Sequence, residues 1–359
     1  MTNRLSWINV ALPALALAAG ELSNAWGADA GAAVEAPGVA HSATLDALYF
    51  WIDESYQSIG LPNYDLGWKH IDGAGASVPN ESFHTRAGGT GISAAVGYLF
   101  PDGTLWPQFG SDARLELSGF YTKADANQSG AATAAGGQLG IGLLAGGNPT
   151  QNIACGICTT ESTLRTSYSG WQIDAKGASE YRFGMLSLKP SFSLFGAGTN
   201  SDQTLSQLVL TNVLVAGYDV QSALFWQDWG AKAGLDARLR LGSALAIGLG
   251  GNVGVATRHV SLSASDLDAN LASPPTLSSS IAQGLSTTPF LANLEATLAG
   301  SPAPGVGLKA FVGLNYDTRV PGLAAPSFLG PTGPPVGSAG IKLEAETSYY
   351  AGGGLTIKF

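Results

Sequence analysis

Apolar and polar residues alternate one by one along ten segments of this chain, and each segment is ten or more residues long. Side chains of a β-strand point alternately to the two faces of its sheet, so this period of two predicts strands with one apolar and one polar face. No segment of comparable length has the spacing of an amphipathic helix. The predicted strands are 45–58, 89–101, 112–125, 166–180, 184–198, 226–241, 243–259, 288–300, 304–319 and 340–359.

The connections between these strands alternate between long and short along the whole chain. The short ones contain turn formers, as in Arg182-Phe183-Gly184, whereas the long ones are rich in Gly, Ala, Ser, Thr, Asn and Pro. An even number of strands, with short turns at one end and long loops at the other, is typical of a transmembrane barrel. A weak hairpin near 61–71 or 205–218 would raise the strand number from ten to twelve.

The composition agrees with an outer surface that meets lipid. Only 12% of the residues are charged, about half of the usual share, while 45% are hydrophobic. Lipid offers no hydrogen-bond partners, so a sheet that crosses a bilayer must close on itself. We therefore expect an all-β fold, a closed antiparallel transmembrane β-barrel with short periplasmic turns and long extracellular loops. The alternative, a soluble β-sandwich, would have shorter strands and loops of more even length.

The N-terminal residues have the features of an export signal. Arg4 precedes the apolar run Leu5–Ala19, and small residues follow. We expect a signal peptide at 1–30 with cleavage near 25–30, then a flexible tail at 31–44 and the barrel at 45–359. The alternative is a single membrane anchor, but the run is shorter than the roughly 20 residues that cross a bilayer. A net charge of -9 without a basic patch argues against nucleic acid as a partner.

The last strand ends in an aromatic residue. Its alternate positions are Tyr349, Ala351, Gly353, Leu355, Ile357 and Phe359. This pattern resembles the assembly signal of outer-membrane β-barrel proteins of Gram-negative bacteria, a class that includes porins. The resemblance implies that the barrel-assembly machinery reads Tyr349, Leu355, Ile357 and Phe359. It also implies export through the periplasm and residence in the bacterial outer membrane, in contact with its lipid.

The charged residues of the strands are expected to line the lumen, because the apolar faces meet lipid. Ten strands enclose an interior close to the size that side chains alone fill. Side chains of mixed sign either cross this lumen and pair, which holds the barrel closed, or line a thin path for small polar solutes or ions. The cations are Arg114, Lys176, Lys189, Lys232, Arg238, Arg240, Arg258, Lys309, Lys342 and Lys358, and the anions are Asp53, Glu116, Asp174, Glu180, Asp236, Glu295, Asp317, Glu344 and Glu346.

The remaining candidate motifs do not indicate catalysis. Cys155 and Cys158 predict a local disulfide in an exported loop. Ten-stranded omptin proteases carry an Asp pair that faces an Asp–His pair; Asp266-Leu267-Asp268 supplies the first, but no Asp-x-His occurs. Neither a GxSxG motif nor metal-ligand spacing is present. We therefore assign no catalytic, cofactor-binding or metal residue and do not expect an enzyme.

Two functions fit these expectations. The first is a structural or porin-like role, with at most a narrow channel for small polar solutes or ions. The second is a surface adhesin or receptor that acts through its long extracellular loops, above all the loop at about 126–165. A third, the β-domain of an autotransporter, is disfavoured because little chain precedes the first predicted strand.

Overall fold

The computed structural model describes residues 48–66, 69–70, 82–100, 112–135, 138–140, 144, 152–154, 157–211, 215–242, 245–270, 276–328, 335–336 and 338–359. Their strands are β1 (Leu48–Gly60), β2 (Lys69–His70), β3 (Arg86–Phe100), β4 (Asp112–Ala135), β5 (Gln138–Gly140), β6 (Asn152–Ala154), β7 (Ile157–Phe183), β8 (Leu186–Thr211), β9 (Val215–Arg240), β10 (Leu245–Asn270), β11 (Thr276–Thr287), β12 (Phe290–Ala303), β13 (Val306–Ala324), β14 (Ser327–Phe328), β15 (Pro335–Val336) and β16 (Gly340–Lys358). Among the described residues, no helix has both the length and the apolar character that crossing a membrane requires.

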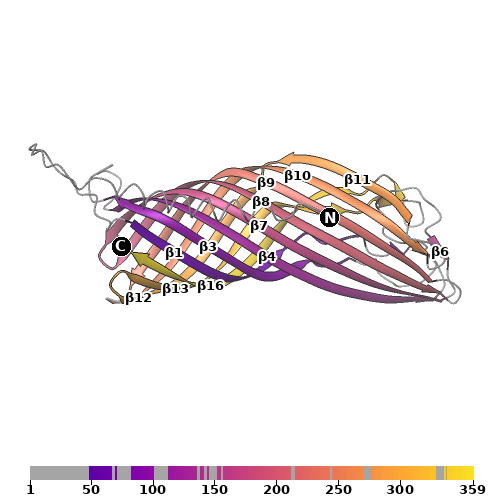
Figure 1. Ribbon diagram of the computed structural model, residues 1–359, viewed down its shortest axis with the longest axis horizontal. Coiled ribbons are helices and arrows are strands. Elements are labelled where there is room, and N and C mark those ends of the chain that lie inside the picture. The colour runs from indigo at the N-terminus through magenta and orange to yellow at the C-terminus, as the bar shows by residue number, and fades with distance from the viewer. Residues whose placement is uncertain are drawn as a thin grey trace, which may run out of the picture. The chain divides into compact units, whose positions relative to one another are not determined.

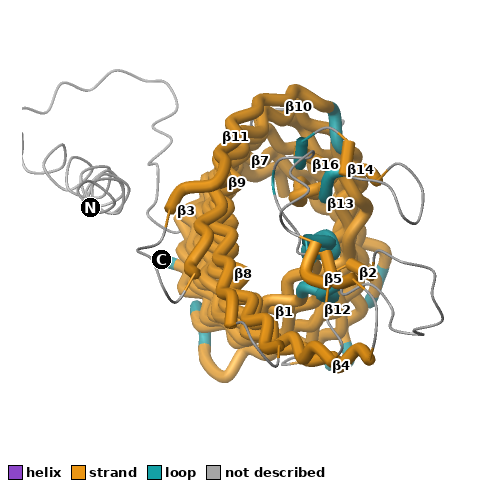
Figure 2. Tube along the Cα trace, turned by 90° about the vertical axis from the view of Figure 1, so that its right-hand side faces the viewer, coloured by secondary structure: helices purple, strands orange, loops and turns teal. Residues whose placement is uncertain are grey.

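The main sheet closes into a ring of antiparallel strands. Its order is β11-β10-β12-β13-β16-β1-β3-β4-β7-β8-β9, and β9 pairs back onto β10. The first strand pairs with the last, with Tyr49 opposite Lys358 at one end and Ser58 opposite Tyr349 at the other. Ten strands therefore complete the circuit, which confirms the predicted closed antiparallel architecture. Figure 2 shows this ring along its axis.

The eleventh strand, β11, continues the line of β12 along the same neighbour, β10. The break between them contains Pro289, which has no N–H to donate to the ladder, while the amide of Ala256 donates to its carbonyl. Within the described chain β11 has a backbone ladder with β10 alone. Its other side contacts Ala339 and Ile341 through the side-chain amide of Gln283.

An apolar belt surrounds the outside of the ring. Every strand of the circuit contributes large exposed apolar side chains to it. Hydrocarbon solvates such a surface, and the closed ring leaves no backbone edge unpaired in it. The chain is therefore a transmembrane β-barrel of the bacterial outer-membrane type. One belt residue from each strand is Ile52, Ile92, Leu117, Ile173, Leu194, Leu235, Leu249, Leu298, Val312 and Tyr349.

The short turns lie together at one end of the barrel. Gly184, Gly242 and Gly305 have φ angles of 61°, 144° and 75°, in the region that favours glycine. The amide of Phe359 donates to the carbonyl of Leu48 over 3.2 Å, so the C-terminal residue closes the ring at its first strand. In Figure 1 the C-terminus marks this end, at the left.

Five neighbouring strands run well past the belt. β4 has 24 residues, β7 has 27, and β8, β9 and β10 have 26 each. About 9–11 tilted residues suffice to cross the hydrocarbon. Figure 1 shows these strands extending toward the right, beyond the ends of the shorter ones. More than half of each long strand therefore exceeds the length needed to cross the hydrocarbon.

The sequence analysis was wrong about where these strands end. It assigned 126–165 to a loop, but β4 continues to Ala135 and β7 begins at Ile157. The physical reason is a reversal of polarity above the belt: Leu164 and Leu205 are buried on the inward face, whereas Arg165 is exposed outward. Small polar residues that face water on an extended strand have the composition of a loop.

The twelve-strand alternative is also wrong for the described residues. Residues 205–211 belong to β8 and 215–218 to β9. Within the other proposed hairpin, β2 pairs with β5 in a separate three-stranded sheet. The expected signal peptide and tail, at 1–44, lie outside the described residues.

Candidate functional site

The candidate site is the polar lumen at the level of the belt. The register places the predicted charges of β4, β7, β9 and β12 on the face opposite to the belt residues, because directly opposed residues of paired strands share a face. Asp53 of β1 is buried there and its Oδ2 lies 2.6 Å from Nζ of Lys309. Nζ of Lys232 lies 3.6 Å from Oδ1 of Asp174.

Several of these partners meet across an intervening glycine. One row crosses three neighbouring strands, with Lys309 on β13, Gly354 on β16 and Asp53 on β1. The side chains of Lys309 and Asp53 form their ion pair above the backbone of Gly354. A Cβ at Gly354 would overlap the Asp53 carboxylate. The glycine thus provides the space in which the ion pair lies against the wall.

Two further rows have the same construction. Tyr49 lies over Gly97 and donates to Oε2 of Glu116 over 2.8 Å. On the neighbouring strands β16, β13 and β12, Tyr350 lies over a glycine of β13 and donates to Oε2 of Glu295 over 3.0 Å. We call these three arrangements the glycine-bridged rows. In all three, the bonded side chains follow the circumference of the barrel and do not cross its diameter.

Some paired side chains of the lumen keep part of their surface exposed. The inward-facing side chains of Lys309, Lys232 and Asp174 keep 28%, 15% and 18% of their surface exposed although each is in an ion pair. One predicted alternative was that long charged side chains cross the lumen and fill it. The two ion pairs described at this level instead join strands that are separated by a single strand. The belt-level interior is polar, and its described ion pairs lie along the wall.

A buried arginine marks the upper end of this polar region. Arg258 is only 2% exposed. Its guanidinium donates to both carboxylate oxygens of Asp228, over 2.7 and 2.6 Å, and to Oδ2 of Asp317 over 2.7 Å. It also donates to the backbone carbonyl of Arg319. Such charge-assisted, two-pronged bonds are among the strongest side-chain contacts, so this group fixes β9, β10 and β13 at one level.

Above Arg258 the interior becomes apolar and closed. Its largest cluster of buried residues joins inward side chains of β7–β10 to residues of the connections. The connection after β1 contributes Tyr64 and Leu66, and the one before β3 contributes Phe83. Leu144 and Ala339 complete it from two other connections. The wall residues include Leu164, Leu205, Val220, Leu224, Val260 and Leu262.

The other predicted lumen residues lie near the two ends. Toward the extracellular end, Nζ of Lys342 contacts Asp65 at 2.6 Å and Glu344 at 3.0 Å. Toward the short turns, Glu180 contacts the guanidinium groups of Arg182 and Arg240. The register also places further predicted residues on the lumen face, namely Arg114, Lys176, Lys189, Asp236, Arg238 and Glu346.

Sequence reasoning missed the uncharged partners of the lumen. Tyr49, Trp51 and Tyr350 donate to lumen carboxylates, and Asn293 donates to the hydroxyl of Tyr350. Asp228, the main partner of Arg258, was also missed. Parity along each strand was the available signal, because Trp51 and Tyr49 precede Asp53 by two and four residues and therefore share its face.

The predicted assembly signal lies on the outward face of β16, where Tyr349 and Phe359 are exposed. Its recognition by assembly machinery stays a prediction. Cys155 lies outside the described residues, so its disulfide with Cys158 also stays a prediction.

The residues once weighed for catalysis have structural contacts. Asp266 is buried, and its carboxylate accepts bonds from the backbone amides of Leu144 and Ser279. These bonds tie Leu144 and Ser279 to β10, so the carboxylate has a structural role at this position. Nδ1 of His84 lies 2.5 Å from Oδ1 of Asn63.

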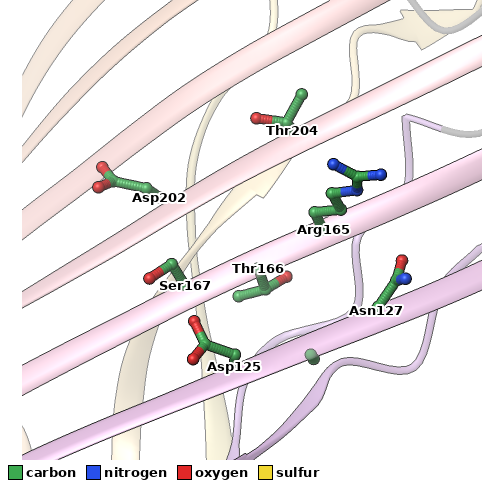
Figure 3. A pocket seen from close by; sticks show the side chains of 8 residues that line it. Asp125, Asn127, Arg165, Thr166, Ser167, Asp202 and Thr204 are labelled. Atoms are coloured by element: carbon green, nitrogen blue, oxygen red, sulfur yellow. The ribbon is translucent and has the colours of Figure 1, made fainter.

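A second concave feature lies on the outer face of the extramembrane sheet. It has a volume of about 490 Å³ and lies over β4, β7 and β8. In the register, Ser167 stands between Asp125 and Asp202, and Arg165 lies in the next row. Figure 3 shows these side chains on the neighbouring strands. This groove is separate from the lumen because its charged residues point outward.

Comparison with known proteins gives a likeness of architecture. No protein-family model and no curated protein matches the chain. Among solved structures, it is similar to the outer membrane protease OmpT from Escherichia coli, with 9% identity and a TM-score of 0.41 over 88% of this chain and 98% of that one. It is also similar to the Pseudomonas putida toluene transporter TodX, with 10% identity and a TM-score of 0.28 over 88% and 92%. The transport unit of the autotransporter AIDA-I from Escherichia coli is similar as well. Its sequence identity is 11% and its TM-score 0.28, over 90% of this chain and 94% of that one. None of these likenesses assigns an activity to this chain.

Proposed function

We propose that this outer-membrane barrel provides a narrow aqueous passage for small polar solutes or ions. The observation that carries the proposal is the set of glycine-bridged rows, in which paired side chains lie along the wall. A lumen that served only to hold the barrel closed would be filled by pairs that cross it. Here the side chains of Lys309, Lys232 and Asp174 stay accessible to water.

The lining also fits a passage of low charge preference. Two lysines of the belt level, Lys309 and Lys232, each have a carboxylate partner, so a passing ion meets few unpaired cations there. Ten strands keep the bore far below that of the 16- to 18-stranded porins, so large solutes are excluded.

A planar-bilayer recording of the purified protein tests this proposal. Asn252 faces the lumen and is partly exposed, so Asn252→Trp adds bulk to the bore and is expected to lower single-channel conductance several-fold. The matched control is Val253→Trp, which places the same side chain on the lipid face and leaves conductance unchanged. Equal conductance in both variants would contradict a path through the lumen.

A surface-binding role is the second candidate, and the outer groove favours it. The groove presents Asp125, Arg165 and Asp202 on a sheet that projects beyond the membrane. Bacteria that display Arg165→Ala together with Asp202→Ala are expected to lose adhesion to host cells while the barrel still folds. Unchanged adhesion would remove the groove from consideration. The control is Lys123→Ala, an exposed residue below the groove on β4.

A further inference from the structure

We propose that residues 61–66 and 82–85 form a removable plug, and that the wall they cover on β7–β9 is a contact surface for uncharged polar solutes. This inference rests on the proposed passage and adds its gate and its solute class. Both parts belong to the connection between β1 and β3: residues 61–66 follow β1 directly, and residues 82–85 directly precede β3. Their apolar side chains join the buried cluster above Arg258.

The plug is a small two-stranded unit with distinct faces. The amide of Tyr64 donates to the carbonyl of Phe83 over 2.9 Å, and the amide of Phe83 donates back over 3.0 Å. Tyr64, Leu66 and Phe83 point into the apolar core, whereas Ser82 and Asp65 bond each other on the exposed side. The described part of the plug thus has one apolar face and one polar face.

The wall beneath the plug is not a pure apolar surface. Polar side chains alternate with leucines and valine on β7–β9, and several are buried with polar atoms that have no hydrogen-bond partner among the described residues: Ser162, Thr166 and Gln207. Both the oxygen and the nitrogen of the Gln207 amide lack a partner. A buried polar group that lacks a partner destabilises a closed core.

The plug itself contributes a polar atom of the same kind. The Tyr64 hydroxyl is buried and lies beside the Ser222 hydroxyl of the wall. Burial raises the pKa of this phenol, and the nearby Ser222 hydroxyl opposes the rise. Withdrawal of the plug would hydrate these groups or offer them to a solute. The closed arrangement therefore holds polar surface whose partners arrive only when the plug leaves.

The wall chemistry selects the solute class. Its unpartnered groups are hydroxyls and a carboxamide, which bind hydroxyl and amide groups of neutral molecules as both donors and acceptors. The unpartnered wall groups carry no charge themselves, and the guanidinium of Arg258 next to them already has the carboxylates of Asp228 and Asp317 as partners. Small polyhydroxyl compounds fit this surface better than ions, since an ion would lose water without gaining a counter-charge.

An ion pair connects the plug to strand β16. Nζ of Lys342 on β16 lies 2.6 Å from Oδ2 of Asp65 and also contacts Glu344 on its own strand. We call the Asp65–Lys342 pair the latch. Partly exposed pairs contribute little to stability, so the latch is weak enough to open without unfolding the barrel. When it opens, Lys342 still has Glu344 as a partner.

The first test breaks and then rebuilds the latch. Asp65→Asn is expected to raise the open fraction of the channel at least several-fold in bilayer recordings. The exchange of both charges, Asp65→Lys with Lys342→Asp, places the lysine beside Glu344 and the new aspartate, and returns the open fraction toward the wild-type value. Arg182→Gln removes an ion pair at the short turns and serves as the matched control. Equal open fractions in Asp65→Asn, the control and the wild type would overturn the plug.

The second test uses the double variant Asp65→Cys, Lys342→Cys in liposomes, with a short thiol-reactive cross-linker that a reductant cleaves. We expect swelling in glucose to be slow while the link is intact and to rise severalfold after cleavage, with the treated wild type as control. Glucuronate and glucosamine match glucose in size but carry opposite charges, so both should enter more slowly. Equal rates before and after cleavage would refute the plug, and faster entry of a charged sugar would refute the neutral wall.

These outcomes separate the inference from the proposed function. If no solute or ion passes in any state of the double variant, including the cleaved one, the passage itself is refuted. If ions and sugars pass at the same rate whether or not the plug is linked, the passage stands and the plug is refuted.

Discussion

At the scale of the residue, glycine decides how the lumen is lined. Gly354 and Gly97 lie between bonded partners, so that each pair passes over a bare stretch of backbone. A side chain at either position would push its neighbours toward the axis. The open bore therefore depends on residues that carry no functional group.

We expect Gly354→Val to break the Lys309–Asp53 pair, because its Cβ would overlap the carboxylate and approach the carbonyl of Ile52. Strain of this kind costs about 1–3 kcal/mol. The temperature at which the folded band disappears from a detergent gel should fall by several degrees. Gly119→Val is the control, since a Cβ there meets open space on the lipid side. Equal shifts in both variants would contradict this account.

The sequence predicted this residue scale only in part. Parity within each strand identified charges such as Lys232 and Glu295 as one face, because alternation is a local property. It could not identify that Tyr350 reaches Glu295 or that Arg258 joins Asp228 and Asp317. Those contacts depend on register between strands, which a single sequence does not contain when loops of unknown length intervene.

At the scale of the element, the long strands are amphipathic twice, in opposite senses. Along β8, Leu194 faces lipid within the belt, and Leu205 faces the closed core above it. They are eleven residues apart, an odd number, so their side chains point to opposite faces of the same strand. One strand can therefore contact lipid with its outer face and the closed core with its inner face. The alternation rule predicted the strand but not the reversal, because hydrophobicity alone does not say which side is inside.

Leu205→Ala should therefore loosen the extramembrane half of β8 and leave its membrane half intact. Loss of a buried leucine costs about 2–5 kcal/mol. Amide hydrogen exchange is expected to accelerate over 199–211 and to stay slow over 186–198. Leu194→Ala, on the same strand but on the lipid face, should not accelerate exchange over 199–211. Uniform acceleration along the strand in both variants would contradict separate cores.

At the scale of the whole molecule, the ring and its belt were predictable, and the plug was not. Ten alternating segments, connections of alternating length and a low charge content all follow from closure in lipid. The connections carry no periodic pattern, so their folding into the bore left no signal. Tyr64 and Phe83 lie in polar surroundings in the sequence, and only the fold brings them onto the apolar wall.

The belt leads to a prediction for the entire protein. The mature chain should require detergent to stay monodisperse, since exposed side chains such as Ile173 and Leu249 would otherwise associate. Size-exclusion chromatography with and without detergent measures this, and circular dichroism checks that β structure persists. A monodisperse, folded protein in plain buffer would invalidate the transmembrane assignment.

The place where the plug leaves the wall has a consequence for biogenesis. Gly60 opposite Arg86 is the last step of the β1–β3 ladder, and the chain enters the plug directly beyond both residues. All ten strands of the circuit can thus form their final pairs before the plug packs into the bore. Insertion into the membrane and sealing of the bore become separate events, so defects in the cover should yield leaky cells with normal amounts of inserted protein.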